Sequence, residues 1–129
     1  MKQPTRQFRF THTHRLHGTK AFAAVYATRL QTRAGPLTVY GRPNGLSHPR
    51  LGLSVGKRIR PAAHRTRIKR MLREAFRLGQ HDWPGGYDLV LVVRPHDLAP
   101  LAYYHRLILE SAYSIHRHQQ RLQRETNKE

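Results

Sequence analysis

Cationic side chains are the most concentrated chemical groups in this sequence, and nine of the 24 Lys and Arg lie in one stretch. Residues 57–77 contain nine Lys or Arg and a single carboxylate, Glu74. The cations are Lys57, Arg58, Arg60, Arg65, Arg67, Lys69, Arg70, Arg73 and Arg77. Like charges four residues apart on a helix repel one another, whereas the guanidinium group of Arg binds phosphate oxygens in a bidentate manner. The stretch therefore indicates a surface that binds a polyanion.

The charge of the whole chain points the same way. Its 129 residues contain 24 Lys and Arg against 7 Asp and Glu, a formal net charge of +17. So large an imbalance opposes compaction by self-repulsion and is best explained by a polyanionic partner. Nucleic acids and membrane headgroups are the two common partners of this kind.

Two other interpretations of the basic stretch are a solvated charged face and a membrane-surface helix. Solvated faces normally mix both signs of charge, and this one does not. A membrane helix needs large apolar side chains free for insertion, but here these are needed to pack on a sheet. RNA is weakly favoured over DNA, because we find no helix-turn-helix spacing, no finger-type zinc ligands and no heptads.

Side chains that could catalyse a reaction or bind a metal are scattered. Of ten histidines, His12, His14 and His17 lie near the N-terminus, where the cations and the few carboxylates argue against a hard-metal site. The seven carboxylates form no cluster able to hold two catalytic metal ions. Without cysteine the chain has no disulfide and no thiol nucleophile. We expect no catalytic residue and no metal site on the protein itself.

The elements that must position the cations follow from hydrophobic periodicity. Ile68, Leu72, Ala75 and Phe76 form one apolar stripe, which predicts a helix over 62–78 that ends at Gly79 and carries its cations away from a core. The spacing of Phe22, Val25 and Tyr26 predicts a helix over 19–30. We expect strands at 37–42, 50–57 and 87–93 and a last helix from Pro100 to about Arg124.

These elements predict an α+β fold, an α/β sandwich in which three helices pack on one sheet of about four strands. The expected order is α-β-β-(β)-α-β-α within a single domain spanning 1–129. Residues 1–17 are expected to be a basic arm and about 120–129 a frayed charged tail. No apolar signal-peptide region is present, and the longest apolar run, 89–93, is too short to cross a bilayer. We expect a soluble, cytoplasmic protein without a membrane partner.

The segment RLGLSVGKRIRPAAHRTRIKRMLRE, residues 50–74, resembles the signature region of the bacterial ribonuclease P protein family. In that family a strand of the form R-x-G-x-x-V-x-K-K leads into a helix beginning R-N-R-x-K-R-x-x-R-E. Two further family patterns are matched in order, the first by Arg15-Leu16 with Phe22, Val25 and Tyr26, and the second by Asp88, Val90, Arg94 and Pro95. Thr66 stands where the family usually has Asn, which removes the paired donor and acceptor of an amide.

The resemblance implies that this is the protein component of ribonuclease P. It would bind the catalytic RNA and the 5′ leader of precursor tRNA, and the RNA, with Mg²⁺, would cut the leader. It implies a left-handed βαβ crossover, a 1:1 complex with the RNA and a free protein that is monomeric. The implied RNA-binding residues are Lys57, Arg58, Arg60, Arg65, Thr66, Arg67, Lys69, Arg70 and Arg73. The implied leader-binding groove is lined by Phe22, Tyr26 and Tyr40.

Other interpretations stay open at this point. A structural or chaperone-like RNA-binding protein of the ribosomal type needs the same basic surface and has no part in catalysis. A self-sufficient ribonuclease would need two histidines converging on a phosphate, which the spacing does not support. Phe22 and Tyr26, four apart on a helix, could be core residues, although aromatics beside a positive groove commonly stack on single-stranded RNA.

Overall fold

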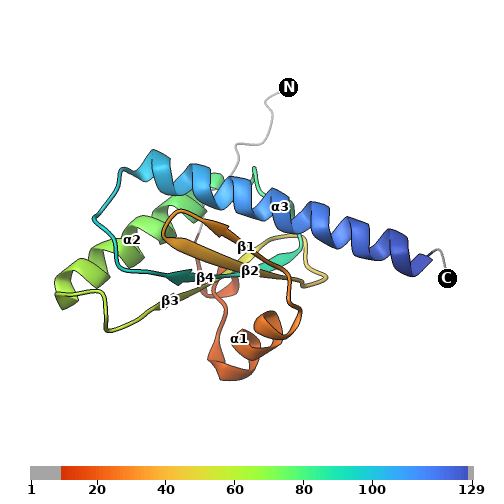
Figure 1. The fold of residues 1–129 in the computed structure, drawn as a ribbon, viewed down its shortest axis with the longest axis horizontal. Helices are drawn as coiled ribbons and strands as arrows, with labels where there is room; N and C mark the ends of the chain where they lie inside the picture. Colours follow the sequence, from red (N-terminus) through yellow and green to blue (C-terminus); the bar gives the residue numbers. More distant parts are fainter. Residues whose placement is uncertain (1–9, 128–129) are drawn as a thin grey trace.

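A mixed four-stranded sheet with helices on both faces organises the protein (Figure 1). The computed structural model describes residues 10–127. Its elements are the 3₁₀ helix η1 (His12–His14), α1 (Gly18–Ala27), β1 (Gln31–Ala34), β2 (Leu37–Pro43), β3 (Arg50–Val55), α2 (Ala62–Gly79), β4 (Tyr87–Val93) and α3 (Leu101–Asn127). The fold is α+β, as predicted, with three α-helices and four strands.

Strand β4 lies inside the sheet, whose order is β1-β2-β4-β3. It pairs antiparallel with β2 and parallel with β3, so that Arg50 lies opposite Asp88. Its side chains are apolar on both faces, as the unbroken run of residues 89–93 predicts. Helix α2 connects the parallel neighbours β3 and β4.

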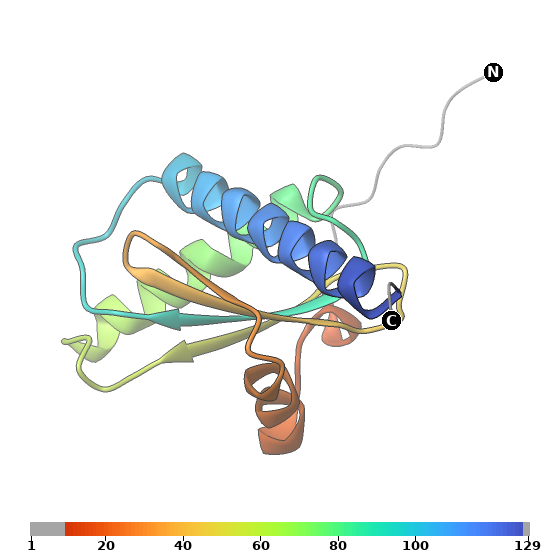
Figure 2. The same ribbon diagram turned by 45° about the vertical axis from the view of Figure 1, so that its right-hand side comes forward.

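Two separate cores cover the two faces of the sheet. Helices α2 and α3 pack on one face, where Ile68, Leu72 and Phe76 are fully buried together with Tyr104 and Ile108. Helix α1 lies on the other face (Figure 2), over a small cluster formed by Leu16, Val25 and Val90. The predicted stripe of α2 is therefore confirmed, and it turns the cations of that helix outward.

The first helix is shorter than predicted, and a strand follows it. Helix α1 ends at Ala27, not at residue 30, because Thr28 Oγ1 donates to the carbonyls of Val25 and Gly41 and ties the chain to β2. Arg29 has a φ of 62°, which turns the chain into β1. The Gly35-Pro36 pair makes the hairpin turn between β1 and β2.

Residues 10–17 are packed on the domain and do not form the extended arm expected from the sequence. The Leu16 backbone N–H donates to the Leu51 carbonyl at 2.9 Å, and the Leu16 side chain is buried beneath α1. Phe10 packs edge-on against Phe76 at 5.8 Å between ring centroids. Burying these two apolar side chains outweighs the solvation of the polar residues between them. Residues 1–9 of the expected arm lie outside the described residues.

Helix α3 continues to Asn127, beyond the expected end near Arg124. The fraying expected over about 120–129 stays a prediction. The last turns of α3 are rich in good helix formers, and cations near the C-terminal end of a helix interact favourably with its dipole. Among the helices of residues 10–127, none is both long and apolar enough to cross a membrane.

Candidate nucleic-acid interface

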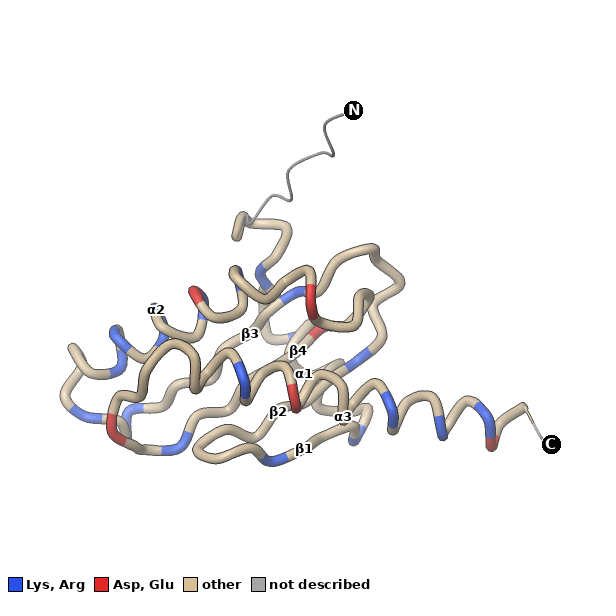
Figure 3. The backbone as a smooth tube through the Cα atoms, turned by 90° about the horizontal axis from the view of Figure 1, so that it is seen from above, with Lys and Arg blue, Asp and Glu red and all other residues tan. Residues whose placement is uncertain are grey.

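The cations of α2 recur along the helix (Figure 3) at positions other than those of its buried apolar stripe, as the sequence predicts. Arg67 and Arg70 are exposed, while Lys69 and Arg73 are half-buried at the edge of the helix nearest β3. The one acid of the helix, Glu74, forms an ion pair with Arg77. The hydrogen bonds from Arg77 lower the pKa of the Glu74 carboxyl, so Glu74 stays ionised and neutralises one cation only.

The inner edge of α2 meets the first aromatic residue of the predicted leader groove in one cavity. This cavity has a volume of about 220 Å³ and lies between residues 10–17, α1, β3 and α2. Its lining includes Phe22 together with three cations, Arg15, Lys69 and Arg73. Partial burial, with a contribution from Arg15, lowers the pKa of Arg73. A phosphate that enters between clustered cations of this kind can accept charge-assisted hydrogen bonds from several of them at once.

The ring of Phe22 lies close to the sheet because the residue beneath it is a glycine. A Cβ atom added to Gly52 of β3 would lie 2.7 Å from Phe22 Cζ, so only glycine leaves room for the ring. The ring also contacts the small core beneath α1. Phe22 is thus half-buried, with one edge in the cavity.

The other two aromatic residues of the predicted groove lie in contact. Tyr26 of α1 and Tyr40 of β2 pack edge to face, with ring centroids 4.9 Å apart and an interplanar angle of 88°. Tyr26 is 37% exposed and Tyr40 is half-buried. Of the three aromatics, Tyr26 is therefore the most accessible to a stacking base.

The remaining predicted RNA-binding residues are spread around α2 and the loop before it. Arg65 is half-buried, and its Nη1 donates to the Ile59 carbonyl at 3.0 Å, which fixes the loop between β3 and α2. The Thr66 hydroxyl donates to the Ala62 carbonyl of its own helix at 3.2 Å. Arg67 lies on the opposite flank from Lys69, in an apolar depression with Met71 and Leu98.

Lys57 and Arg58 lie at the carboxyl end of β3, in a cavity of about 400 Å³ that also includes Arg94. Arg60 is exposed in the same loop. Arg94 Nη1 donates to Thr38 Oγ1 at 2.8 Å, and its Nη2 donates to the Gly35 carbonyl. Arg15 and Arg94 were not proposed as site residues from the sequence. The signal that could have found them is the family pattern, in which both occur.

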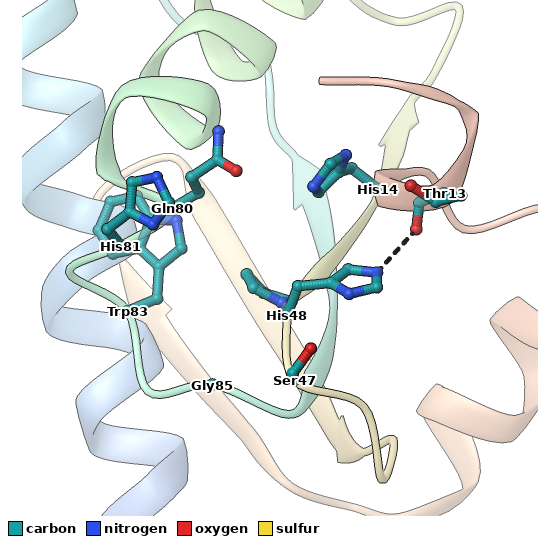
Figure 4. Close-up of a pocket in the computed structure, with 9 residues that line it drawn as sticks. Thr13, His14, Ser47, His48, Gln80, His81, Trp83 and Gly85 are labelled. Atoms are coloured by element: carbon teal, nitrogen blue, oxygen red, sulfur yellow. Dashed lines mark hydrogen bonds between the residues drawn. The ribbon is translucent and has the colours of Figure 1, made fainter. Parts of the chain in front are cut away.

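Two histidines, His14 and His48, meet in a cavity with a volume of about 550 Å³ (Figure 4). The rings of His14 and His48 lie 5.1 Å apart, and His48 Nε2 is 3.1 Å from the Thr13 carbonyl. Burial, and secondarily the charge of His48, lowers the pKa of His14. The sequence spacing of the histidines does not indicate this contact. Within the described part of the chain, residues 10–127, no Lys or Arg lines the cavity, so these residues alone make a poor phosphate site.

The carboxylates do not form a metal site within residues 10–127, where no group of three or more potential ligands gathers. Asp88 is 1% exposed and already accepts hydrogen bonds from Arg50 and Asn44. Arg50 Nη2 lies 2.7 Å from Asp88 Oδ2 and neutralises its charge, so the role of Asp88 is structural.

Comparisons with known proteins agree on one family. Residues 10–108 match the family model described as Ribonuclease P. The chain is 43% identical over 81 residues to the ribonuclease P protein component of Photorhabdus laumondii, covering 62% of this chain and 67% of that relative. It is 42% identical over 92 residues to the component from Methylococcus capsulatus, covering 70% and 71%. The fold is similar to that of the ribonuclease P protein from Thermotoga maritima, with a TM-score of 0.67, 25% identity and coverage of 74% of this chain and 92% of that one.

Proposed function

Since this chain belongs to the ribonuclease P protein family, we propose that it binds the catalytic RNA of the enzyme through α2 and holds the 5′ leader of precursor tRNA against α1 and β2. As a ribonuclease P protein component it is part of an endoribonuclease that processes tRNA. The family relationship sets aside the ribosomal and chaperone-like alternative.

One observation carries the proposal. The cavity beside α1 is lined on one side by an aromatic residue, Phe22, and on the other by the cations Lys69 and Arg73. A single strand of RNA offers a base for stacking and a phosphate for the cations, and sites for single strands combine these two kinds of contact. The exposed edge of Tyr26 beside Tyr40 adds a second aromatic contact on the same side of the sheet.

We propose that the chemistry belongs to the RNA and that Mg²⁺ is held there, with the protein supplying binding energy and position. Magnesium prefers carboxylate oxygens and keeps several waters. The carboxylates best placed near the cations, Glu74 and Asp88, are each paired with an Arg. The protein is proposed to act in the cytoplasm, as a monomer when free and as one copy per RNA.

The experiment compares precursor and mature tRNA, because only the precursor carries a leader. Tyr26→Ala and Tyr40→Ala should each weaken binding of precursor tRNA to the assembled enzyme about 5- to 150-fold, the range expected for the loss of one base stack of roughly 1–3 kcal/mol. Binding of mature tRNA should be nearly unchanged. Tyr113→Ala is the matched control, because Tyr113 is also an exposed tyrosine but lies on α3.

Thermal melts of all three variants separate binding from folding. If the Tyr26 and Tyr40 variants melt like the wild type and bind each tRNA with wild-type affinity, the leader does not lie in this groove. If they weaken both tRNAs alike and lose stability, the two tyrosines are packing residues.

A further inference from the structure

The C-terminal end of α3 projects beyond the rest of the protein (Figure 1). The helix has 27 residues and is therefore roughly 40 Å long. Its last buried residue is Ile115, and every residue from Gln120 to Asn127 is exposed. About two turns of helix thus stand largely in solvent.

Three arginines lie on one side of this projecting end. Arg117, Arg121 and Arg124 are spaced by four and three residues, which places them on one stripe of the helix. The stripe points away from the buried side that contains Tyr104, Ile108 and Ile115. In Figure 3, Lys and Arg positions (blue) recur along the projecting part of α3, apart from those of α2. We call Arg117, Arg121 and Arg124 the α3 arginine stripe.

The α3 arginine stripe has no ion-pair partner within the described residues. Among residues 10–127, none of the ion pairs involves these arginines, and Glu125 forms none with Arg121. By contrast, Arg106, earlier on the same side of α3, lies 4.0 Å from Glu110. Arginines four apart repel one another in the free protein, and an external anion would relieve this repulsion.

The stripe is separate from the surfaces considered so far. Helix α3 covers the sheet face opposite to α1, so the stripe lies on the other side of the sheet from Phe22 and Tyr26. The family match ends at residue 108, before the stripe begins. Neither the family relationship nor the leader groove assigns a role to it.

We propose that the α3 arginine stripe is a second anchoring surface for the sugar–phosphate backbone of the enzyme's RNA subunit. Cations in a fixed row on a helix suit a regular polyphosphate and release counterions when they bind it. A membrane surface fits less well, because a membrane helix needs several large apolar residues and Leu122 is the only one between 117 and 127. The proposal depends on the RNA partner of the family and not on the leader groove.

The test measures binding of the full-length protein to its RNA subunit at several salt concentrations. The variant Arg117→Gln/Arg121→Gln/Arg124→Gln removes three charges and keeps good helix formers. Each phosphate contact contributes about 0.7 to 0.9 to the slope of log affinity against log salt. The slope should therefore become less steep by about two to three units, with at least about a tenfold loss of affinity near 0.1 M salt.

Two further variants control this result. The triple Arg→Lys variant should restore the slope, because the phosphate contact requires charge. The triple variant Gln120→Ala/Gln123→Ala/Thr126→Ala changes the same projecting turns without changing charge, and it should bind like the wild type. Circular dichroism of each variant confirms that the helix is retained.

An unchanged slope in the Arg→Gln variant, with the helix intact, overturns the proposal. So does a loss of affinity that occurs only when tRNA is bound, or arginine-dependent binding to phosphatidylglycerol vesicles with no effect on RNA. The ratio of precursor to mature tRNA affinity should not change in any α3 variant. If the wild-type enzyme bound precursor and mature tRNA with nearly equal affinity, the leader groove would be contradicted. The proposal for the α3 arginine stripe would still stand or fall on its salt slope.

Discussion

Phe22 of α1 lies directly over Gly52 of β3, and the glycine is what allows the ring to approach the sheet. A methyl group at position 52 would stand 2.7 Å from Phe22 Cζ and 3.0 Å from Cε2, so the ring would have to move. Because the clash is with the far end of one side chain, the strand itself need not shift.

Gly52→Ala should therefore disturb the leader groove more than the fold. Overpacking of this kind costs about 1–3 kcal/mol, and the displaced ring should weaken precursor tRNA binding while mature tRNA binding changes little. Gly56→Ala is the control, since nothing lies within 4 Å of a Cβ at that position. Binding assays and thermal melts of both variants check the prediction. Equal effects on the two tRNAs would show that Phe22 does not contact the leader.

The two flanks of α2 should differ in what they bind. Lys69 lines the cavity with Phe22, whereas Arg67 lies on the opposite flank beside Leu98. Each substitution to Ala should flatten the salt slope of RNA-subunit binding by about one unit. Only Lys69→Ala should also lower the preference for precursor over mature tRNA. A loss of that preference in Arg67→Ala would mean that the leader follows the other flank.

Unlike the substitutions of Lys69 and Arg67, substitution of Arg65 should also lower stability, because its guanidinium fixes the loop before α2. Arg65→Ala removes the hydrogen bond to the Ile59 carbonyl. A hydrogen bond from a charged donor contributes roughly 1.5–3 kcal/mol, and this one is half-exposed, so we expect the lower end or less. Its thermal melt should show a loss of stability that Arg67→Ala lacks. Equal melting temperatures would assign Arg65 to RNA binding alone.

The ion pair between Arg50 and Asp88 should matter far more to stability than the one between Arg106 and Glu110. Asp88 is 1% exposed and receives two hydrogen bonds from Arg50 at 2.7 Å, while Arg106 and Glu110 are both 64% exposed. Arg50→Met leaves a buried carboxylate without its cation, which typically costs about 3–5 kcal/mol. Arg106→Met should cost less than about 1 kcal/mol. Denaturant unfolding of the two variants measures the difference, and similar losses would refute this account.

His14 should make the protein less stable in mild acid. Its pKa is lowered from 6.5 by burial and by His48, so the unfolded chain takes up this proton more readily than the folded one. Stability is then unaffected above pH 6.5 and falls as the pH drops through and below that value. His14→Gln should shrink the fall in Tm between pH 7.5 and pH 5, as measured by thermal melts at both pH values. An undiminished fall in His14→Gln would assign the acid sensitivity elsewhere.

The sequence predicts those parts of this fold whose signal is periodic and local. The stripe of α2 and the apolar run of β4 are long enough to be recognised, and both are buried as expected. Strand β1 was missed because QTRA is short and polar, with a sheet partner on one side only. Its place depends on the positive φ of Arg29, which no hydrophobic pattern records.

The candidate site was only partly accessible to sequence reasoning. The cations of α2 are evident from composition, and the aromatic groove came from the family resemblance. The meeting of Arg15 with Arg73 could not be foreseen, because it depends on residues 10–17 pairing with β3 through Leu16 and Leu51. Contacts between distant segments of this kind carry no local pattern.

The division of the core by the sheet has a consequence for motion. Helix α1 rests on a cluster of only three buried apolar residues, Leu16, Val25 and Val90, while α2 and α3 share the much larger cluster on the other face. Segments with few buried contacts open at a lower free energy than the whole domain. The backbone amides of α1 should therefore exchange their hydrogens before those of α2. Helix α1, which forms one side of the proposed leader groove, can then open locally while α2, the proposed RNA-binding helix, stays folded.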